Sequence, residues 1–461
     1  MCAWTSDEIL RATGGVPGHG WSGTPLFSAI CTDTRDVLPG ALFVPLRGER
    51  FDGHEFVHQA LASGAAASLW ARDEIPEGLS ADRLIRVRDG LEAYQALGRE
   101  NLRRLGIPVV AVTGSVGKTT TKDLLASLLG VRFQVHCTRL NFNNEVGVPR
   151  TLLELQPQHE LVVLEMAMRG PGQIRELARL APARVGIITH IGESHLEFLG
   201  SRDAIADAKA ELLDEMPESG VAILPRHSLF FQRMAAHARG RVLTFSGEGP
   251  ADWTAVRVHP LGLEGSDVEV RHPEGISKVR FGLPGRHNVS NLLAALAAAR
   301  ELGLTCEEVS EPLAGFRPSG LRTEVLHLPD GTTLLNDSYN AAPSSMKGAL
   351  EVLSGAQGRR VAVLGDMLEL GSAEEDFHRE VGEAVARTGV TVLVAVGARS
   401  RVLARAARLA GVPTVHWTPG REEAWSVVRA EVRAGDAVLI KASRGIGLDV
   451  IAERLRGVQE R

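Results

Sequence analysis

Cysteine is scarce in this sequence, and its spacing does not match a metal site. The four cysteines, Cys2, Cys31, Cys137 and Cys306, lie far apart, and no CxxC pair occurs. Because thiolate metal sites use closely spaced cysteines, this pattern argues against one. Thiols this sparse fit a reducing cytoplasm, and we therefore expect a cytoplasmic protein.

Long hydrophobic runs and an excess of positive charge are also lacking. The most apolar stretch, AALAAA at 294–299, is far shorter than the roughly 20 residues that a membrane span needs. The N-terminal residues lack the pattern of an export signal and instead predict a helix capped at Ser6. The net charge of −5 offers no basic excess for nucleic acid or an anionic membrane. We expect neither of these partners.

The sequence has the composition of an ordinary globular protein, and the chain is too long for a single hydrophobic core. Its 461 residues predict roughly two to four domains. Three regions differ in pattern: short strands and turns over 1–88, apolar runs alternating with helices over 89–316, and a second such alternation over 317–461. Continuous apolar runs such as IPVVAVTG are typical of parallel strands buried on both faces, whereas 252–283 alternates and predicts inserted antiparallel strands. We predict a three-domain α/β protein with a small first domain, a P-loop ATPase-like middle domain and a doubly wound, Rossmann-like last domain.

The stretch AVTGSVGKTTTKDLL, residues 111–125, is typical of a phosphate-binding loop. Gly117, Lys118 and Thr119 fill the last three positions of the pattern G-x-x-x-x-G-K-[ST], although Val112 stands where the first glycine belongs. Glycines allow backbone N–H groups to surround a phosphate, and the helix that follows adds its positive end. The predicted phosphate-binding residues are Thr113, Gly114, Ser115, Val116, Gly117, Lys118, Thr119 and Thr120. The alternative is a simple glycine turn with a solvated lysine.

Seven motifs occur in an order and spacing that resemble the Mur ligases. They are TGSVGKTTTKDLL (113–125), LNFNNEVGVP (140–149), VVLEMAMRGPGQI (162–174), ITHIGESHLEFLG (188–200), AIADAKAELL (204–213), PGRHNVSNLLAALA (284–297) and LNDSYNAAPSSM (335–346). Together with GDMLELGSAEEDFH (365–378), they most resemble the branch of the family that adds a dipeptide.

The resemblance implies an amide ligase of peptidoglycan precursor synthesis. ATP would phosphorylate the carboxylate of a UDP-N-acetylmuramoyl tripeptide, and D-alanyl-D-alanine would attack the acyl phosphate. Residues 1–88 would bind the UDP-muramoyl peptide and 89–316 would bind ATP. Residues 317–461 would take the dipeptide and close over ATP. The resemblance also implies two Mg²⁺ ions and a monomer.

Several residues of the middle region acquire roles from the resemblance. Glu165 ends a buried strand, where a carboxylate faces the ligand crevice and can bind Mg²⁺. His195 would belong to a second Mg²⁺ site. In the phosphate loop, Thr119 or Thr120 can offer a hydroxyl to Mg²⁺. Lys209 would be catalytic as a carbamate, which requires a neutral amine. Asn144, in preference to Asn143, would polarise the acyl phosphate or contact the γ-phosphate. Without the resemblance, His195 could have no function, Lys209 could lie on the surface, and the asparagines could form a turn.

The remaining predicted site residues lie in the last and first regions. Asn291 would lie near the adenine, and Arg322 and Asp337 would reach the nucleotide. The substrates would be bound by Tyr339, Asn340, Ser345, Lys441 and by the UDP motif Thr32, Asp33, Thr34 and Arg35. Arg35 suits a diphosphate because its planar fork pairs with two oxygens. The segment KASR at 441–444 differs from the usual KGSR of the branch, so dipeptide contacts there stay open.

Four alternatives remain at this stage. A ligase that adds a single amino acid would carry a D-N-P-[RK] motif, but DSYNAAPSS stands in its place. Folylpolyglutamate synthase would lack the UDP motif. An ATP-hydrolysing switch would not need the polar strand ends of the last region. A catalytically dead scaffold would not need Lys118, Glu165 and His195.

Overall fold

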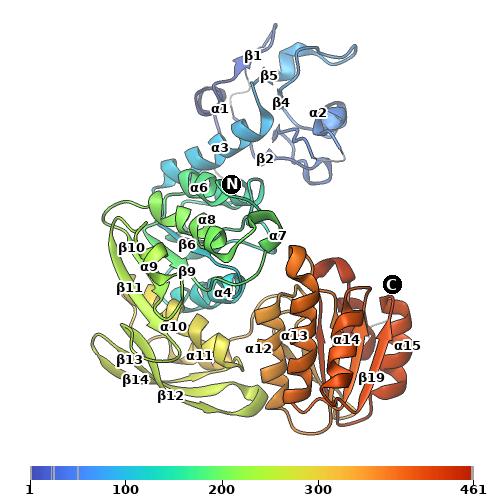
Figure 1. Cartoon of the computed structure of the whole chain (residues 1–461). Coiled ribbons are helices and arrows are strands. Elements are labelled where there is room, and N and C mark those ends of the chain that lie inside the picture. Colours follow the sequence, from blue (N-terminus) through green and yellow to red (C-terminus); the bar gives the residue numbers. More distant parts are fainter. Residues whose placement is uncertain (1–2, 22, 24–25, 49–50, 458–461) are drawn as a thin grey trace. The chain divides into compact units, whose positions relative to one another are not determined.

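The computed structural model describes residues 3–21, 23, 26–48 and 51–457 (Figure 1). By contacts the chain divides into two compact units. The first comprises residues 1–110, 133–166 and 176–183, and the second comprises 111–132, 167–175 and 184–461. The three predicted domain ranges are not tested by this division and stay a prediction.

The first unit contains a five-stranded sheet in the order β1-β5-β4-β3-β2. Its strands are β1 (Val16–Pro17), β2 (Ile30–Cys31), β3 (Leu42–Phe43), β4 (Ala67–Trp70) and β5 (Leu84–Arg86), with only β1 antiparallel to its neighbour. Helices α1 (Ser6–Thr13), α2 (Val57–Ala62) and α3 (Gly90–Leu105) accompany it. The predicted cap at Ser6 is wrong. Thr5 is the N-cap, because its side chain and that of Glu8 each accept a hydrogen bond from the other's backbone N–H.

A second sheet has nine strands in the order β14-β13-β12-β11-β10-β9-β6-β8-β7, and both units share its strand β6 (Val109–Thr113). The first unit contributes β7 (Val135–Cys137) and β8 (Leu161–Glu165). The second contributes β9 (Val185–Ile188), β10 (Val221–Pro225), β11 (Arg241–Ser246), β12 (Trp253–Pro260), β13 (Ser266–His272) and β14 (Gly275–Phe281). Every residue of β6 and β8 is buried, as the continuous apolar runs predict.

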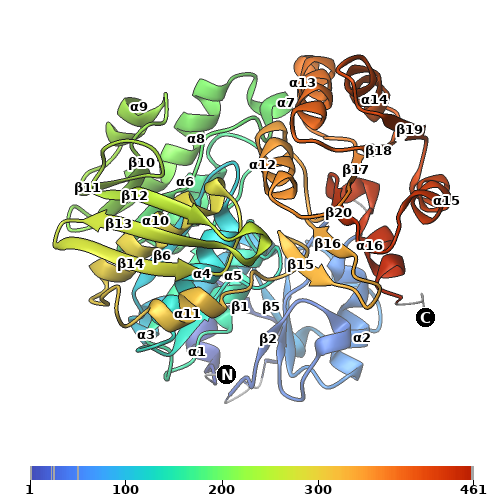
Figure 2. The same ribbon diagram turned by 90° about the horizontal axis from the view of Figure 1, so that it is seen from below.

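The predicted antiparallel insertion is confirmed, since β12, β13 and β14 form an antiparallel meander (Figure 2). The helices that belong to this part of the chain are α4 (Lys118–Leu129), α5 (Gly147–Leu153), α6 (Gln173–Leu180), α7 (Leu196–Leu199), α8 (Arg202–Asp214), α9 (Phe231–Ala235), α10 (Arg286–Glu301) and α11 (Ser310–Gly315).

The last region forms a six-stranded sheet in the order β15-β16-β20-β17-β18-β19. Its strands are β15 (Glu324–His327), β16 (Thr333–Asn336), β17 (Arg360–Gly365), β18 (Val392–Val396), β19 (Thr414–Thr418) and β20 (Ala437–Lys441), with only β15 antiparallel. One face packs on α12 (Pro343–Ser354), α13 (Glu374–Arg387) and α14 (Ser400–Leu409), and the other on α15 (Arg421–Glu431) and α16 (Asp449–Leu455). The doubly wound prediction is therefore confirmed.

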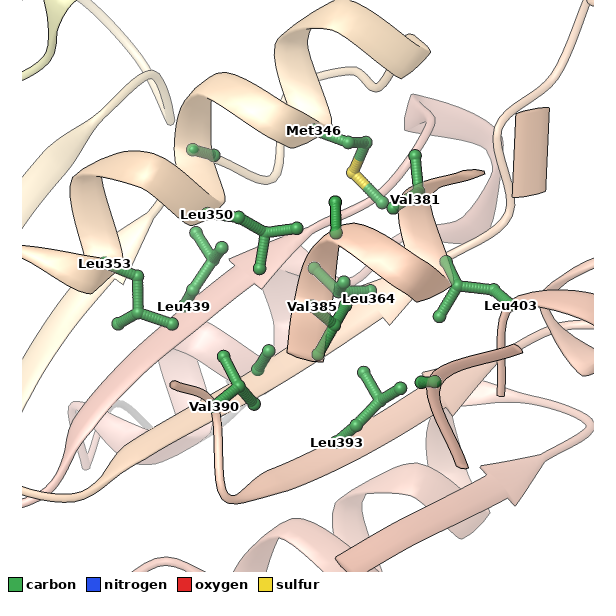
Figure 3. Close-up of a cluster of buried hydrophobic side chains, with 14 of the residues drawn as sticks. Met346, Leu350, Leu353, Leu364, Val381, Val385, Val390, Leu393, Leu403 and Leu439 are labelled. Carbon is green, nitrogen blue, oxygen red and sulfur yellow. The ribbon is translucent and has the colours of Figure 1, made fainter. Parts of the chain in front are cut away.

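Alternate side chains of these strands supply the two cores. Leu364, Leu393 and Leu439 point to the side of α12 and α13, where they meet Met346, Leu350 and Val385 (Figure 3). Their neighbours Val363, Val394 and Ile440 pack on the opposite face. Because β16, β20 and β17 are parallel, their carboxyl ends lie at the same edge of the sheet. Asp337, Lys441 and Asp366 lie at this edge.

Candidate active site

The predicted phosphate loop is a glycine turn between a buried strand and a helix. β6 ends at Thr113 and α4 begins at Lys118. Gly117 has φ 88°, and a Cβ there would lie 2.4 Å from Asn291 Oδ1. Gly114 has φ 147°, and a Cβ there would lie 2.0 Å from Thr189 Oγ1. Both positions therefore require glycine, which lets the backbone approach its neighbours closely.

Hydrogen bonds fasten the loop to the chain that follows β9. Thr189 Oγ1 donates to the carbonyl of Val116 at 2.6 Å, and Ser115 N donates to the carbonyl of His190 at 2.7 Å. The Lys118 ammonium donates to the carbonyl of Gly114 at 2.9 Å, so it folds back over the turn. The loop is thus preorganised, with its lysine held at the helix N-terminus, where an anion is favoured.

This loop forms one wall of a cavity of about 680 Å³. The size is that of a site for a small molecule or cofactor. Many of the predicted nucleotide and substrate residues line the cavity: Ser115, Val116, Gly117, Lys118, Thr119, Thr120, Asn291, Arg322, Asp337, Tyr339, Asn340, Ser345 and Lys441. The structure brings these residues together although they are spread over more than three hundred positions of the sequence.

The cavity also has a wall that the sequence analysis did not predict. His227, Ser246, Glu248, Arg257 and Arg286 line it, and most of them come from the ends of β10 and β11 and from β12. None of these five residues was predicted as a site residue, and among them only Arg286 falls within one of the seven motifs, PGRHNVSNLLAALA. The glycine-rich stretch SGEG that begins at the end of β11 is the one local signal that could have drawn attention to this wall.

The first turns of α10 place two asparagines and a histidine at the cavity. Asn288 Nδ2 donates to the carbonyl of Pro284 at 2.7 Å, and Asn291 Nδ2 donates to Asn288 Oδ1 at 3.0 Å. Asn291 Oδ1 consequently faces Gly117 of the phosphate loop. Burial lowers the pKa of His287 to about 4, so this ring is neutral at physiological pH.

The residues from the last region are held by one another. Lys441, only 3% exposed, donates to Asp337 Oδ2 at 2.6 Å and to the carbonyl of Asn340 at 2.8 Å. The guanidinium of Arg322 lies 4.0 Å from the ring centroid of Tyr339. Ser345 Oγ accepts from Ala342 N at 2.9 Å and so caps α12. Ser345 and Tyr339 therefore make structural contacts in addition to lining the cavity.

His195 and Lys209 lie in the same unit but do not line the cavity. Lys209 is 1% exposed. Burial, followed by the charge of Lys118, holds the pKa of Lys209 well below its usual range. Burial likewise lowers the pKa of His195, against an opposing effect of Glu369. His195 Nδ1 lies 2.7 Å from Glu369 Oε2, a partner that the sequence analysis did not predict.

Glu165 and the two asparagines lie together in the first unit. Glu165 is 2% exposed and accepts a hydrogen bond from Asn143 Nδ2 at 2.7 Å. Asn144 Oδ1 accepts from Gly147 N at 2.9 Å and so forms the turn that starts α5. Among the contacts that the structure describes, Asn143 is therefore the asparagine that contacts the Glu165 carboxylate. Asn144 stabilises the turn before α5, which is the structural role that the sequence left open for it.

The predicted UDP motif forms a tight turn in the first unit. Asp33 caps η1 (Thr34–Asp36) by accepting from Arg35 N at 2.9 Å, and Thr32 precedes it. Hydrogen bonds from the Arg35 side chain and backbone lower the pKa of Asp33 to about 2. The Arg35 side chain is 85% exposed, so its guanidinium remains accessible to a ligand.

Two residues carry oxygen donors of the kind that Mg²⁺ prefers. Within the described residues, no group of three or more His, Cys, Asp or Glu side chains could hold a metal by itself. Mg²⁺ does not need such a cage, because it binds through one or two carboxylates, substrate phosphates and water. A buried carboxylate at the end of β8, Glu165, and a hydroxyl at the start of α4, Thr119, are donors of the required kind.

Family models match nearly the whole chain. They are described as "Mur ligase family, catalytic domain" at residues 27–112, "Mur ligase middle domain" at 112–299 and "Mur ligase, glutamate ligase domain" at 321–444. A protein of Bacillus subtilis (strain 168) named UDP-N-acetylmuramoyl-tripeptide–D-alanyl-D-alanine ligase is 38% identical, covering 92% of each chain.

The chain belongs to the Mur ligase family. Among solved structures, MurF from Acinetobacter baumannii is similar with a TM-score of 0.91 and 31% identity, covering 99% of each chain. MurF ligase from Thermotoga maritima, solved in complex with ADP, has a TM-score of 0.84 and 28% identity, covering 93% of this chain and 97% of that one. This Mur ligase has the three-domain α/β architecture of these relatives, as predicted from its sequence.

Proposed function

We propose that this Mur ligase joins D-alanyl-D-alanine to a UDP-N-acetylmuramoyl tripeptide, at the expense of ATP, in peptidoglycan precursor synthesis. The observation that carries the proposal is the cavity in which the phosphate loop meets polar residues of the last sheet. The name and near-complete coverage of the Bacillus subtilis relative support the choice of substrates. We place the enzyme in the cytoplasm. None of the helices in the described part of the chain has the length and apolar composition to cross a bilayer.

In the first step a carboxylate oxygen of the tripeptide attacks the terminal phosphorus of ATP, and ADP leaves. The backbone N–H groups of Gly114, Val116 and Gly117, the start of α4 and the Lys118 ammonium surround that phosphate with positive charge. Mg²⁺, when bound, would further neutralise the phosphate charge, and Glu165, Thr119 and His195 are the residues that would hold it. Such phosphoryl transfer relies on positioning and electrostatics rather than covalent chemistry.

In the second step the dipeptide amine attacks the acyl carbon, and inorganic phosphate leaves with the oxygen that the carboxylate supplied. Asn143 or Asn144 would polarise the acyl phosphate. Lys209, whose pKa burial lowers, would take up CO₂ as a carbamate and orient the metal site. Tyr339, Asn340, Ser345 and Lys441 would face the substrates, Asn291, Arg322 and Asp337 the nucleotide, and Thr32 to Arg35 the UDP group.

The proposal predicts strict dependence on every substrate. Phosphate release is measured with ATP, Mg²⁺, UDP-N-acetylmuramoyl tripeptide and D-alanyl-D-alanine, and each component is omitted in turn. We expect release only in the complete mixture, because each step consumes the product of the one before. Replacing the dipeptide with a single amino acid should abolish sustained release.

Two outcomes would contradict this function. Undiminished release without the tripeptide and the dipeptide would identify an ATP-hydrolysing switch. Sustained release with a single amino acid in place of the dipeptide would identify a ligase of the single-amino-acid-adding type.

A further inference from the structure

The loop that follows β17 reaches the residues around α7. Within its own domain this loop is firmly held: Met367 N donates to His378 Nε2 at 3.1 Å, and Leu368 N donates to Ser443 Oγ at 3.0 Å. The next residue, Glu369, contacts the segment that follows β9. The hydrogen bonds of the two preceding residues thus fix the position from which Glu369 extends its carboxylate.

Three contacts define this meeting of loop and α7. Glu369 Oε2 lies 2.7 Å from His195 Nδ1, and the carbonyl of Glu369 accepts from Glu197 N at 3.2 Å. A Cβ on Gly371 would lie 3.2 Å from the Cα of Glu197, so the backbones approach closely. We call these three contacts the His195–Glu369 junction.

The backbone on both sides of the junction is strained. His195 has φ 67° and Glu369 has φ 63°, a left-handed conformation that is unfavourable for any residue other than glycine. Strain of this kind persists where the surrounding structure enforces it, and it clusters at functional sites. Its occurrence in both partners of one contact indicates that the contact serves a purpose beyond packing.

The chemistry of the contact fits a histidine that is being oriented. Metal-binding histidines almost always have their second ring nitrogen held by a carboxylate or carbonyl, which fixes the tautomer and the ring plane. Here Nδ1 lies 2.7 Å from Oε2 of Glu369. Such contacts commonly tighten when a site binds its ligands. With Nδ1 beside the Glu369 carboxylate, Nε2 is the ring atom left for a metal or phosphate.

We propose that Glu369 is a positioning residue that holds His195 in the Nδ1–H tautomer. A residue of the last domain would thereby orient a histidine of the metal site. This inference rests on the proposed function, because it takes His195 to belong to that site. The role of Glu369 differs from the predicted roles of Arg322, Asp337 and Lys441, which would contact nucleotide or substrate directly. Glu369 acts only through His195.

The test compares E369A, E369Q and H195Q with the wild type in the full chain, and uses E375Q as the control. Glu375 is an exposed glutamate nearby on α13. Three readouts are taken: imidazole ¹⁵N shifts of the metal-free protein, Mn²⁺ affinity in the presence of a non-hydrolysable ATP analogue, and kcat and KM for phosphate release. The His195 signal is assigned by its loss in H195Q.

We expect E369A to lose the Nδ1–H tautomer and to lower Mn²⁺ affinity and kcat by about 10- to 100-fold, with KM for ATP little changed. E369Q should recover part of both losses, because its amide oxygen still accepts from Nδ1. The double variant H195Q/E369A should be no worse than H195Q, since Glu369 acts through that ring.

Two results would overturn the inference. One is an E369A protein that keeps the Nδ1–H tautomer of His195 and whose Mn²⁺ affinity and kcat stay within twofold of those of E375Q. The other is an E369A protein that raises KM or lowers the melting temperature while kcat is unchanged, which would make the junction a structural contact. If H195Q itself is fully active, the proposed role of His195 fails, and this outcome is distinct from a failure of Glu369 alone.

Discussion

At the scale of single residues, Lys209 shows how burial changes chemistry. Its side chain is almost completely removed from water, and the positive charge of Lys118 adds to the cost of protonation. Both effects favour the neutral amine, which is the form that reacts with CO₂. In the sequence the same lysine lies on an ordinary amphipathic pattern, so its burial could not be predicted from DAIADAKAELL alone.

The lowered pKa predicts a carbamate at Lys209. Protein equilibrated with ¹³C-bicarbonate should show a carbamate resonance by ¹³C NMR, and K209Q should lack it. Because the pKa is depressed, the signal should persist at neutral pH and disappear as the pH falls through the lysine's lowered pKa, where protonation removes the nucleophile. K347Q, which alters an exposed lysine paired with Glu380, is the control and should keep the signal. An identical resonance in K209Q would exclude this site.

At the scale of elements, the phosphate loop depends on backbone geometry more than on side chains. Gly117 ends the turn and precedes α4 in a left-handed conformation. Its neighbour Asn291 is buried and held by Asn288, so it cannot move aside freely. The loop and the start of α10 are therefore fitted to each other.

We expect G117A to abolish nucleotide binding at a modest cost in stability. The added methyl group would clash with Asn291 and strain the turn, whereas the left-handed backbone itself costs only about 1–2 kcal/mol. Calorimetric titration with ATP analogue and thermal melting measure the two effects. G315A is the control, because a Cβ at Gly315 meets nothing within 4 Å. Unchanged nucleotide affinity in G117A would contradict the assignment of this loop.

The elements that the sequence predicted well are those whose burial is complete. β6, β8, β18 and β20 are buried at every position, which leaves a continuous apolar run in each. The edge strands β15 and β19 have a weaker apolar signal, because they are only partly buried and contain polar residues, as in TVHWT at 414–418. Edge strands lose one neighbour, and the apolar signal weakens with it.

At the scale of the whole molecule, the cavity combines segments that no local pattern connects. The motifs predicted the phosphate loop, Asn291 and the polar strand end at Asp337, because each is a recognisable local arrangement. They did not predict the wall built from β10 to β12, or the contact of Glu369 with His195, because both arise only from tertiary packing. The role of each site residue stays a prediction until it is tested.

The central claim is that a carboxylate becomes reactive by accepting the terminal phosphate of ATP. Its most direct test uses UDP-N-acetylmuramoyl tripeptide labelled with ¹⁸O in the carboxylate that is joined to the dipeptide. The released phosphate is then analysed by mass spectrometry. The account predicts one ¹⁸O atom in each phosphate released during ligation. Phosphate that contains no ¹⁸O, while the amide product forms, would contradict it.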